Sequence, residues 1–157
     1  MMGRILLLLF IPLFVLAYSI SPNPYLTIHR VSSPPDIDGL LNDECWQSSN
    51  WQFAKDVLSG SAEGDELSFA LLYDDSNLYL AAKIREKQPQ VSHQQDDIPV
   101  YEDSCLEVFL DNPLPNLPLN TYRHYIVNAQ GYKYDEIGNK GGKSWNGNWK
   151  AKTRETE

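Results

Sequence analysis

The sequence predicts an all-β protein, an antiparallel β-sandwich of the jelly-roll or immunoglobulin-like kind. Short runs in which apolar residues alternate with others recur along the chain, and turn-forming residues separate them. No segment shows a helical pattern longer than one or two turns. Nine Tyr and four Trp give a high aromatic content, which suits a β protein with a sugar-like ligand. Short strands at close spacing are the pattern of sandwiches and jelly rolls.

The clearest strand signal in the sequence lies at residues 102–111. Alternating side chains of a strand point to opposite faces, and here both faces carry apolar residues. We therefore expect an interior strand with cover on both sides. Glu107 falls between Cys105 and Phe109 on one face, where an ionised carboxylate needs a partner.

Two hairpins are predicted on either side of this strand. The first joins residues 66–73 and 78–85 through an Asp-Asp-Ser-Asn turn, and the second joins residues 121–128 and 132–136. The remaining elements are shorter. They are a first strand at residues 25–31, one helical turn at 40–46 with Asn42 as N-cap, and a strand that starts at 149–153.

The N-terminus has the pattern of a signal peptide over residues 1–19. Arg4 supplies the positive start, residues 5–17 are apolar, and Ala17 and Ser19 give small residues for cleavage after Ser19. The apolar run is too short for a comfortable membrane span, which takes about 20 residues. We expect export to the periplasm, the cell surface or the medium, with residues 20–157 as one domain.

The net charge limits the kinds of partner that we expect, and the two cysteines leave two possible thiol states. The net charge is −8 and becomes more negative when Arg4 is removed, so binding to nucleic acid or anionic membrane through charge is not expected. Cys45 and Cys105 would stand in an oxidising compartment, where a disulfide is one option and two free buried thiols are the other.

The C-terminal end is predicted to leave the domain incomplete. The sequence reaches Glu157 just as a strand begins, in a charged run without a packing partner.

Four segments, taken in order, resemble the family 9 carbohydrate-binding modules. Residues 37–46 (IDGLLNDECW) resemble the opening I-D-G-x-L-x-(D/E)-x-x-W of that family, and residues 73–79 (YDDSNLY) resemble its Y-D-D-x-x-L-Y hairpin. Residues 103–111 (DSCLEVFLD) resemble its acidic strand, and residues 122–131 are similar to its Y-x-x-x-x-N-x-x-G hairpin. The closing G-W-x-x-E-x-x-I-P segment of the family is absent, which is consistent with C-terminal truncation.

The resemblance implies an antiparallel β-sandwich that binds oligo- or polysaccharide and often accompanies a glycoside hydrolase, such as a xylanase. Such modules stack a pyranose on aromatic rings and bind its hydroxyls with planar polar groups. Trp145 is the first candidate platform, and Trp51 and Trp149 are the others, although each is also a normal packing residue. The candidate polar contacts are Arg85, Glu107, Asn128, Lys143 and Asn146. Arg85 has a structural alternative, an ion pair with Glu107 or Asp111.

Other functions are weighed against sugar binding. A structural calcium would take acids from Asp74, Asp75, Asp103 and Asp111, although the first two also fit a tight turn. No other cofactor is expected for sugar binding. A haem-binding sandwich of an exported redox chain is the alternative; both methionines leave with the signal, so its ligands would come from His29, His93 and His124. A structural or adhesive surface domain without a ligand is a third reading. No hydrolase or protease motif is present, so we expect no catalysis by this chain itself.

Overall fold

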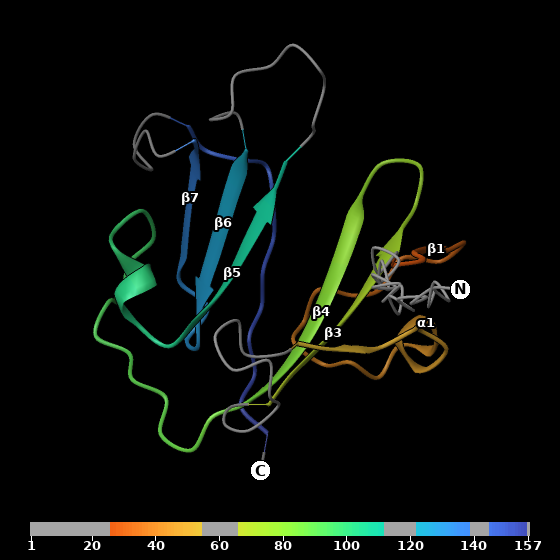
Figure 1. Ribbon diagram of the computed structural model, residues 1–157, viewed down its shortest axis with the longest axis horizontal. Coiled ribbons are helices and arrows are strands. Elements are labelled where there is room, and N and C mark those ends of the chain that lie inside the picture. The colour runs from red at the N-terminus through yellow and green to blue at the C-terminus, as the bar shows by residue number, and fades with distance from the viewer. Residues whose placement is uncertain (1–25, 55–65, 112–121, 139–144, 157) are drawn as a thin grey trace, which may run out of the picture.

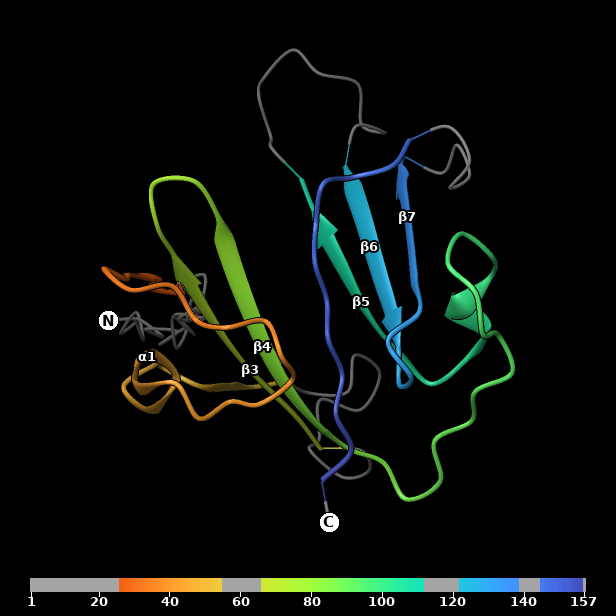
Figure 2. The same ribbon diagram turned by 180° about the vertical axis from the view of Figure 1, so that it is seen from behind.

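The computed structural model of the protein describes residues 26–54, 66–111, 122–138 and 145–156. Two sheets, mostly antiparallel and with almost no helix, stand side by side and form the predicted all-β sandwich (Figure 1). The view from behind shows the extended C-terminal segment running between them (Figure 2). In the described parts of the chain, no helix has the length and apolarity that a membrane crossing would need.

The first sheet is built on the hairpin of β3 (Glu66–Tyr73) and β4 (Leu78–Arg85), which confirms the first predicted hairpin. Its turn is closed by the Asp74 carboxylate, which accepts backbone hydrogen bonds at 2.7 and 2.8 Å from the two residues that precede β4. Two short strands pair with β3 as well: β1 (His29–Arg30) in parallel and β2 (Gln52–Phe53) antiparallel. The predicted first strand is thus much shorter than 25–31 within the described residues.

The core of this sheet lies against α1 (Glu44–Gln47). Trp46 projects from that helix and is only 3 % exposed, which agrees with the apolar helical turn that was predicted. The N-cap is Asp43 and not Asn42. On the sheet, the buried side chains are those of Ala70, Leu72, Tyr79 and Ala81.

The second sheet has the order β5–β6–β7, with β5 (Cys105–Leu110), β6 (Arg123–Asn128) and β7 (Lys133–Ile137). β6 and β7 confirm the second predicted hairpin. A short 3-10 helix, η1 (Val100–Glu102), covers one face, and the side chains of Val100 and Ile126 are completely buried.

The prediction that residues 102–111 form an interior strand is wrong. Among the described residues β5 pairs with β6 alone and lies at the edge of its sheet. Apolar residues on both faces indicate partial cover above and below a strand, but they say nothing about its lateral neighbours. At this edge Phe109 remains 58 % exposed and Leu110 40 % exposed.

Residues 145–156 are extended but pair with no described strand. The strand predicted from residue 149 therefore has an extended backbone, but it forms no ladder of hydrogen bonds with the described residues. Trp145 and Trp149 pack edge-on against Tyr125 of β6, with ring centroids 5.7 and 5.2 Å away. Further along, Thr153 lies against both Gly131 and Gly39, whose φ angles are +90° and +82°. The segment therefore joins the second sheet to the loop before α1.

Candidate functional site

The most exposed aromatic ring of the second sheet belongs to Phe109 on β5. Its ladder partner is His124 of β6, so both side chains project from the same face. The two rings are stacked, with centroids 3.9 Å apart and 17° between their planes. One side of the phenyl ring is thus occupied while the residue stays 58 % exposed.

Glu107 stands two residues before Phe109 on this face and bonds to His124. Its Oε2 lies 2.8 Å from His124 Nε2, and Glu136 Oε1 lies 3.3 Å from the other ring nitrogen. The side chain of His124 is 9 % exposed, whereas that of Glu107 is 38 % exposed. Two carboxylates hold the imidazole ring in place, and one of them retains acceptor capacity toward solvent. We call Glu107, Phe109 and His124 the Phe109 ledge.

The chemistry of the ledge suits recognition of a polyhydroxylated ring. A phenyl face offers apolar contact to the CH groups of a pyranose, and a carboxylate at its side accepts hydroxyl hydrogen bonds.

The thiol of Cys105, at the start of β5, is unsuited to nucleophilic chemistry. Burial, with the carboxylates of Glu107 and Asp103, raises the pKa of Cys105 to about 11, so the thiol stays protonated at neutral pH.

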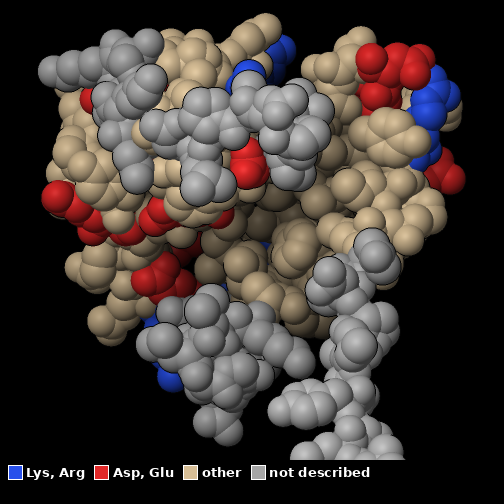
Figure 3. All heavy atoms as spheres, turned by 45° about the horizontal axis from the view of Figure 1, so that its top comes forward, with Lys and Arg blue, Asp and Glu red and all other residues tan. Residues whose placement is uncertain are grey.

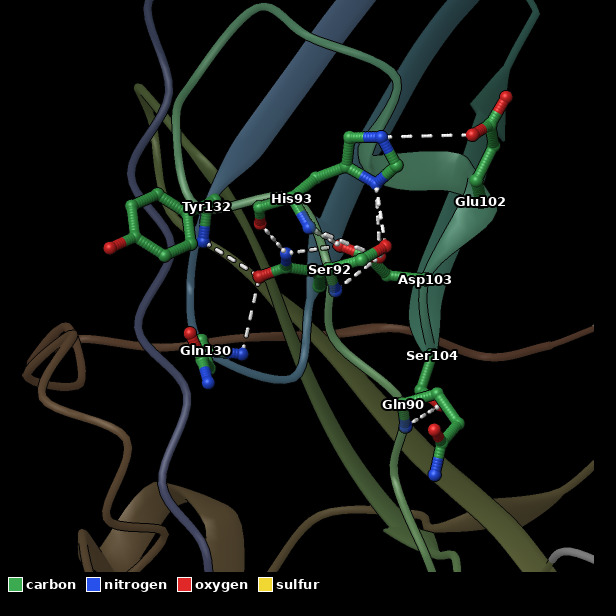
Figure 4. Close-up of polar contacts among 9 residues, drawn as sticks. Gln90, Ser92, His93, Glu102, Asp103, Ser104, Gln130 and Tyr132 are labelled. Atoms are coloured by element: carbon green, nitrogen blue, oxygen red, sulfur yellow. Dashed lines mark hydrogen bonds and ion pairs between the residues drawn. The ribbon is translucent and has the colours of Figure 1, made fainter.

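A second polar group surrounds Asp103, just before β5 (Figure 4). Its carboxylate accepts hydrogen bonds from the Ser92 N–H at 2.9 Å, the Ser92 hydroxyl at 2.8 Å and the His93 N–H at 3.1 Å. The side chain is 1 % exposed. Burial raises the pKa of this carboxyl, but hydrogen bonds from Ser92, His93 and Asn128 outweigh that effect and hold it well below its usual range.

Asn128, at the end of β6, completes this group. Its amide donates to Asp103 Oδ2 and to the His93 carbonyl, both at 2.8 Å, and the residue is fully buried. Its Oδ1 accepts the N–H groups of Gln130 and Tyr132 in the turn between β6 and β7. The network therefore ties the loop before η1 to that turn.

Ser92, His93 and Asp103 are the residue types of a hydrolase triad, but their geometry differs from one. In a triad, serine and aspartate engage opposite nitrogens of the imidazole. Here Ser92 Oγ and Asp103 Oδ1 both lie near His93 Nδ1, at 3.2 and 3.0 Å, and the hydroxyl donates to the carboxylate. The other nitrogen of His93 faces Glu102 at 3.6 Å. The arrangement clamps a loop and activates no nucleophile.

In a comparison with known families, the family model described as carbohydrate family 9 binding domain-like matches residues 37–154, which is well over half of the chain. The chain belongs to this family. That membership confirms the resemblance found in the four sequence segments and supports carbohydrate binding by this family 9-like domain. No curated protein and no solved structure gave a significant match.

The family 9-like domain brings Trp145 and Trp149 together beside Tyr125 and Gly147, but it places Trp51 on the other sheet. Trp51 packs against the core of the first sheet and donates its indole N–H to the Trp46 carbonyl at 2.9 Å, with Lys83 Nζ 4.3 Å from its ring centroid. Trp149 donates its indole N–H to Asp135, which is 3 % exposed. Trp145 is half-buried beside Tyr125.

The candidate polar residues of the domain are also dispersed. Asn128 is buried and its amide is occupied by the network described above, whereas Asn146 is exposed on the C-terminal segment. Arg85 ends β4 opposite Glu66 in the ladder, and Glu107 pairs with His124 and not with Arg85. Lys143 lies outside the described residues. Among the candidates that the structure describes, Glu107 is therefore the one that adjoins an exposed aromatic ring.

The four candidate calcium ligands are engaged elsewhere or stand apart. Asp74 closes the β3–β4 turn, Asp75 pairs with Arg30, and Asp103 is in the buried network. Asp111 is exposed just after β5. Among the described residues, no group of three or more acidic, His or Cys side chains is placed to hold a metal ion.

The histidines and cysteines are distributed over both sheets, α1 and the loop before η1. His29 is exposed on β1, and His93 and His124 are bonded to carboxylates, His124 through both ring nitrogens. This arrangement lends no specific support to the haem alternative. Cys45, on α1, and Cys105, on β5, are both free thiols in the structure.

Sequence reasoning missed Phe109 as a site residue and considered His124 only as a haem ligand, not as part of a sugar site. Phe109 stands two positions after Glu107, so the shared face was readable from the sequence, but its exposure depends on β5 lying at an edge. The contact with His124 depends on the β5–β6 register, which pairs residues 15 apart in the chain. The acidic side chains spread over the lobe formed by β5–β7 and the hollow beside it are visible only on the folded surface (Figure 3).

Proposed function

We propose that this domain is an exported sugar-binding module that serves the breakdown of xylan- or cellulose-type polysaccharide, with the Phe109 ledge as its binding site. The observation that carries the proposal is the exposed ring of Phe109, stacked on His124 and adjacent to the Glu107 carboxylate. Membership of a carbohydrate-binding family supports a sugar as the ligand of this site.

The ledge fits a neutral pyranose for two physical reasons. The outer side of the phenyl ring can cover the apolar face of the sugar, and His124 beneath it prevents the ring from tilting away. Glu107 is still 38 % exposed at its side chain, so its carboxylate is accessible to sugar hydroxyls. Hydrogen bonds to a charged acceptor are stronger than those between neutral groups.

Two further parts of the proposal, export and a glycoside hydrolase partner, are supported by other observations. Residues 1–19 have the charge, apolar run and small residues of a signal peptide. A single stacked ring and one carboxylate supply modest affinity, so such a module is most useful when it is held beside a glycoside hydrolase. It would then raise the local concentration of that enzyme on its polymer.

The test is calorimetric titration of the protein with glucose, cellobiose and xylo-oligosaccharides. Phe109→Ala should weaken binding at least about tenfold, which corresponds to about 1.4 kcal/mol. Phe53→Ala is the matched control, because Phe53 is 77 % exposed on β2 of the other sheet. Trp145→Ala should leave binding unchanged.

Two results would count against the proposal. If Trp145→Ala abolishes binding and Phe109→Ala does not, the sugar site lies on the C-terminal segment and not on the ledge. If a protein that is folded by circular dichroism binds none of these sugars, the sugar specificity proposed here is wrong.

A further inference from the structure

The sheet face that carries the Phe109 ledge extends across β6 to β7. Glu107 of the ledge shares a ladder row with Ile126 of β6 and Tyr134 of β7, so these three side chains project from one face. Tyr125, the neighbour of Ile126 along β6, projects from the opposite face, and the C-terminal segment packs against it there. Tyr134 therefore lies on the same face as the ledge, away from that segment.

A second exposed aromatic ring stands on this face. Tyr101 of η1 packs edge-on against Tyr134, with ring centroids 5.4 Å apart and 83° between the planes. Such a contact covers only part of each ring, and Tyr101 remains 46 % exposed. The green turn of η1 lies beside β7, on the side away from β4 (Figure 1). The face thus has one open aromatic ring on β5 and another beside β7.

Buried neighbours on both sides fix the position of Tyr101. Val100, which precedes it, is completely buried, and the side chain of Asp103, two residues after it, is only 1 % exposed. The Asp103 N–H donates to the Val100 carbonyl at 3.2 Å and closes the turn between them. Tyr101 is therefore held before any ligand arrives, which lowers the entropy that binding costs.

A chain of polar contacts connects Tyr101 to the ledge. The hydroxyl of Tyr134 donates to Glu136 Oε2 at 3.3 Å, and Glu136 Oε1 lies 3.3 Å from His124 Nδ1. His124 in turn supports the ring of Phe109. The side chain of Glu136 is only 13 % exposed, so it adds little surface between the two open rings.

The two open rings are too far apart for one sugar. Tyr134 lies two strands across and two residues along from Phe109, which places their Cα atoms about 12 Å apart in a regular sheet. A pyranose covers little more than the aromatic ring on which it stacks. A carbohydrate that contacts both Phe109 and Tyr101 must therefore contain several linked sugars.

We propose that Tyr101 forms a second sugar subsite, and that the domain binds a stretch of several linked sugars in preference to a single sugar. This inference rests on the proposed function, because it takes the Phe109 ledge as the first subsite. Once one sugar of a chain is stacked on Phe109, a later sugar meets Tyr101 at a high effective concentration. Stacking on the second ring then adds affinity that a monosaccharide cannot obtain.

The experiment compares sugars of two lengths. Calorimetry on the full chain with the pairs xylose and xylotetraose, and glucose and cellotetraose, should show the tetrasaccharide of at least one pair binding at least about tenfold more tightly. That gain exceeds what the number of its sugar units alone provides. Tyr101→Ala should lower the tetrasaccharide affinity about fivefold and leave the monosaccharide affinity unchanged.

Two further variants control for the ring and for the substitution. Tyr101→Phe keeps the ring and should bind both sugar lengths as the parent protein does. Tyr73→Ala is the matched control, since Tyr73 is 40 % exposed on β3 of the other sheet, and it should change neither affinity. Circular dichroism checks that each variant is folded.

The results separate this inference from the proposed function. The inference is overturned if both sugar lengths bind the parent protein alike, or if folded Tyr101→Ala keeps the parent's tetrasaccharide affinity. It is also overturned if Tyr101→Ala weakens both lengths equally, since the ring would then belong to the first subsite. Phe109→Ala should weaken both lengths, and a normal affinity in that variant contradicts the proposed function itself and this inference with it.

Discussion

The phenyl ring of Phe109 lies almost flat on the imidazole of His124, and Glu107 and Glu136 hold that imidazole from its two nitrogens. The exposed ring is therefore supported from below by a side chain that cannot easily rotate. A binding surface fixed before the ligand arrives loses less conformational entropy on binding. This support distinguishes Phe109 from Phe53, whose exposed ring stacks on no ring among the described residues.

Glu107→Gln tests the carboxylate of the ledge. The substitution keeps the size of the side chain but removes the charge, so hydrogen bonds to sugar hydroxyls should weaken by about 1 kcal/mol, a fall in affinity of about fivefold. Calorimetry on the same sugars measures the change. Glu102→Gln is the control, since the side chain of Glu102 is 61 % exposed on η1. Equal affinities for Glu107→Gln and the parent protein would remove Glu107 from the site.

Asn128→Ala should destabilise the domain strongly. The amide is fully buried and serves Asp103, the His93 carbonyl and two N–H groups of the following turn. Leaving these groups unpaired should lower the free energy of unfolding by about 3 kcal/mol. Urea denaturation measures this loss, and Asn146→Ala, at an exposed position, should change it little. A loss below that of the control would show that water replaces the amide without cost.

Stability should decline in acid because of Asp103. The pKa of this carboxyl is below its usual value of 3.8 in the folded protein, so the folded state prefers the ionised form. Its stabilising contribution is complete above the unfolded pKa and is lost progressively as the pH falls below about 4. Urea denaturation between pH 2.5 and 6 should show this fall. Asp103→Asn should be less stable at neutral pH and should show a shallower fall; an unchanged slope would contradict the assignment.

Trp149→Phe should weaken the attachment of the C-terminal segment. Phenylalanine keeps most of the packing on Tyr125 but removes the N–H that is bonded to the buried carboxylate of Asp135. We expect a loss of about 2 kcal/mol in the free energy of unfolding, because hydrogen bonds to charged groups contribute about 1.5–3 kcal/mol. Chemical denaturation tests this, with sugar affinity as the internal control. Intact stability would mean that the Gly147 N–H alone satisfies Asp135.

The hairpins were predictable from sequence because their determinants are local. Alternation and a turn of Asp, Ser and Asn fix the β3–β4 pair, and the Asp74 carboxylate closes that turn without help from distant residues. The family was predictable for the same reason, since its motifs coincide with these turns and strands. Position in a sheet is different. The edge location of β5 depends on which strands lie beside it, and no residue within β5 encodes that.

The candidate site was predictable in part. Glu107 was identified as a partly buried acid that needs a partner, but the partner, His124, belongs to a strand that follows a long connection. The tryptophans were favoured as platforms because of their type. Their burial is decided by contacts across the fold, as with Trp149 and Asp135, whose side chains are 14 positions apart in sequence.

The two sheets possess separate buried cores, one around Trp46 and Leu72 and the other around Val100 and Ile126. The strand pairs β3–β4, β5–β6 and β6–β7 within them all join neighbours along the chain. The β3–β4 and β6–β7 hairpins can therefore form from short-range contacts, whereas the closure of one half on the other needs contacts of the C-terminal segment with Gly39, which are distant in sequence. Damage to that closing step would leave two structured halves that move relative to each other, and an intact secondary-structure spectrum would conceal the defect.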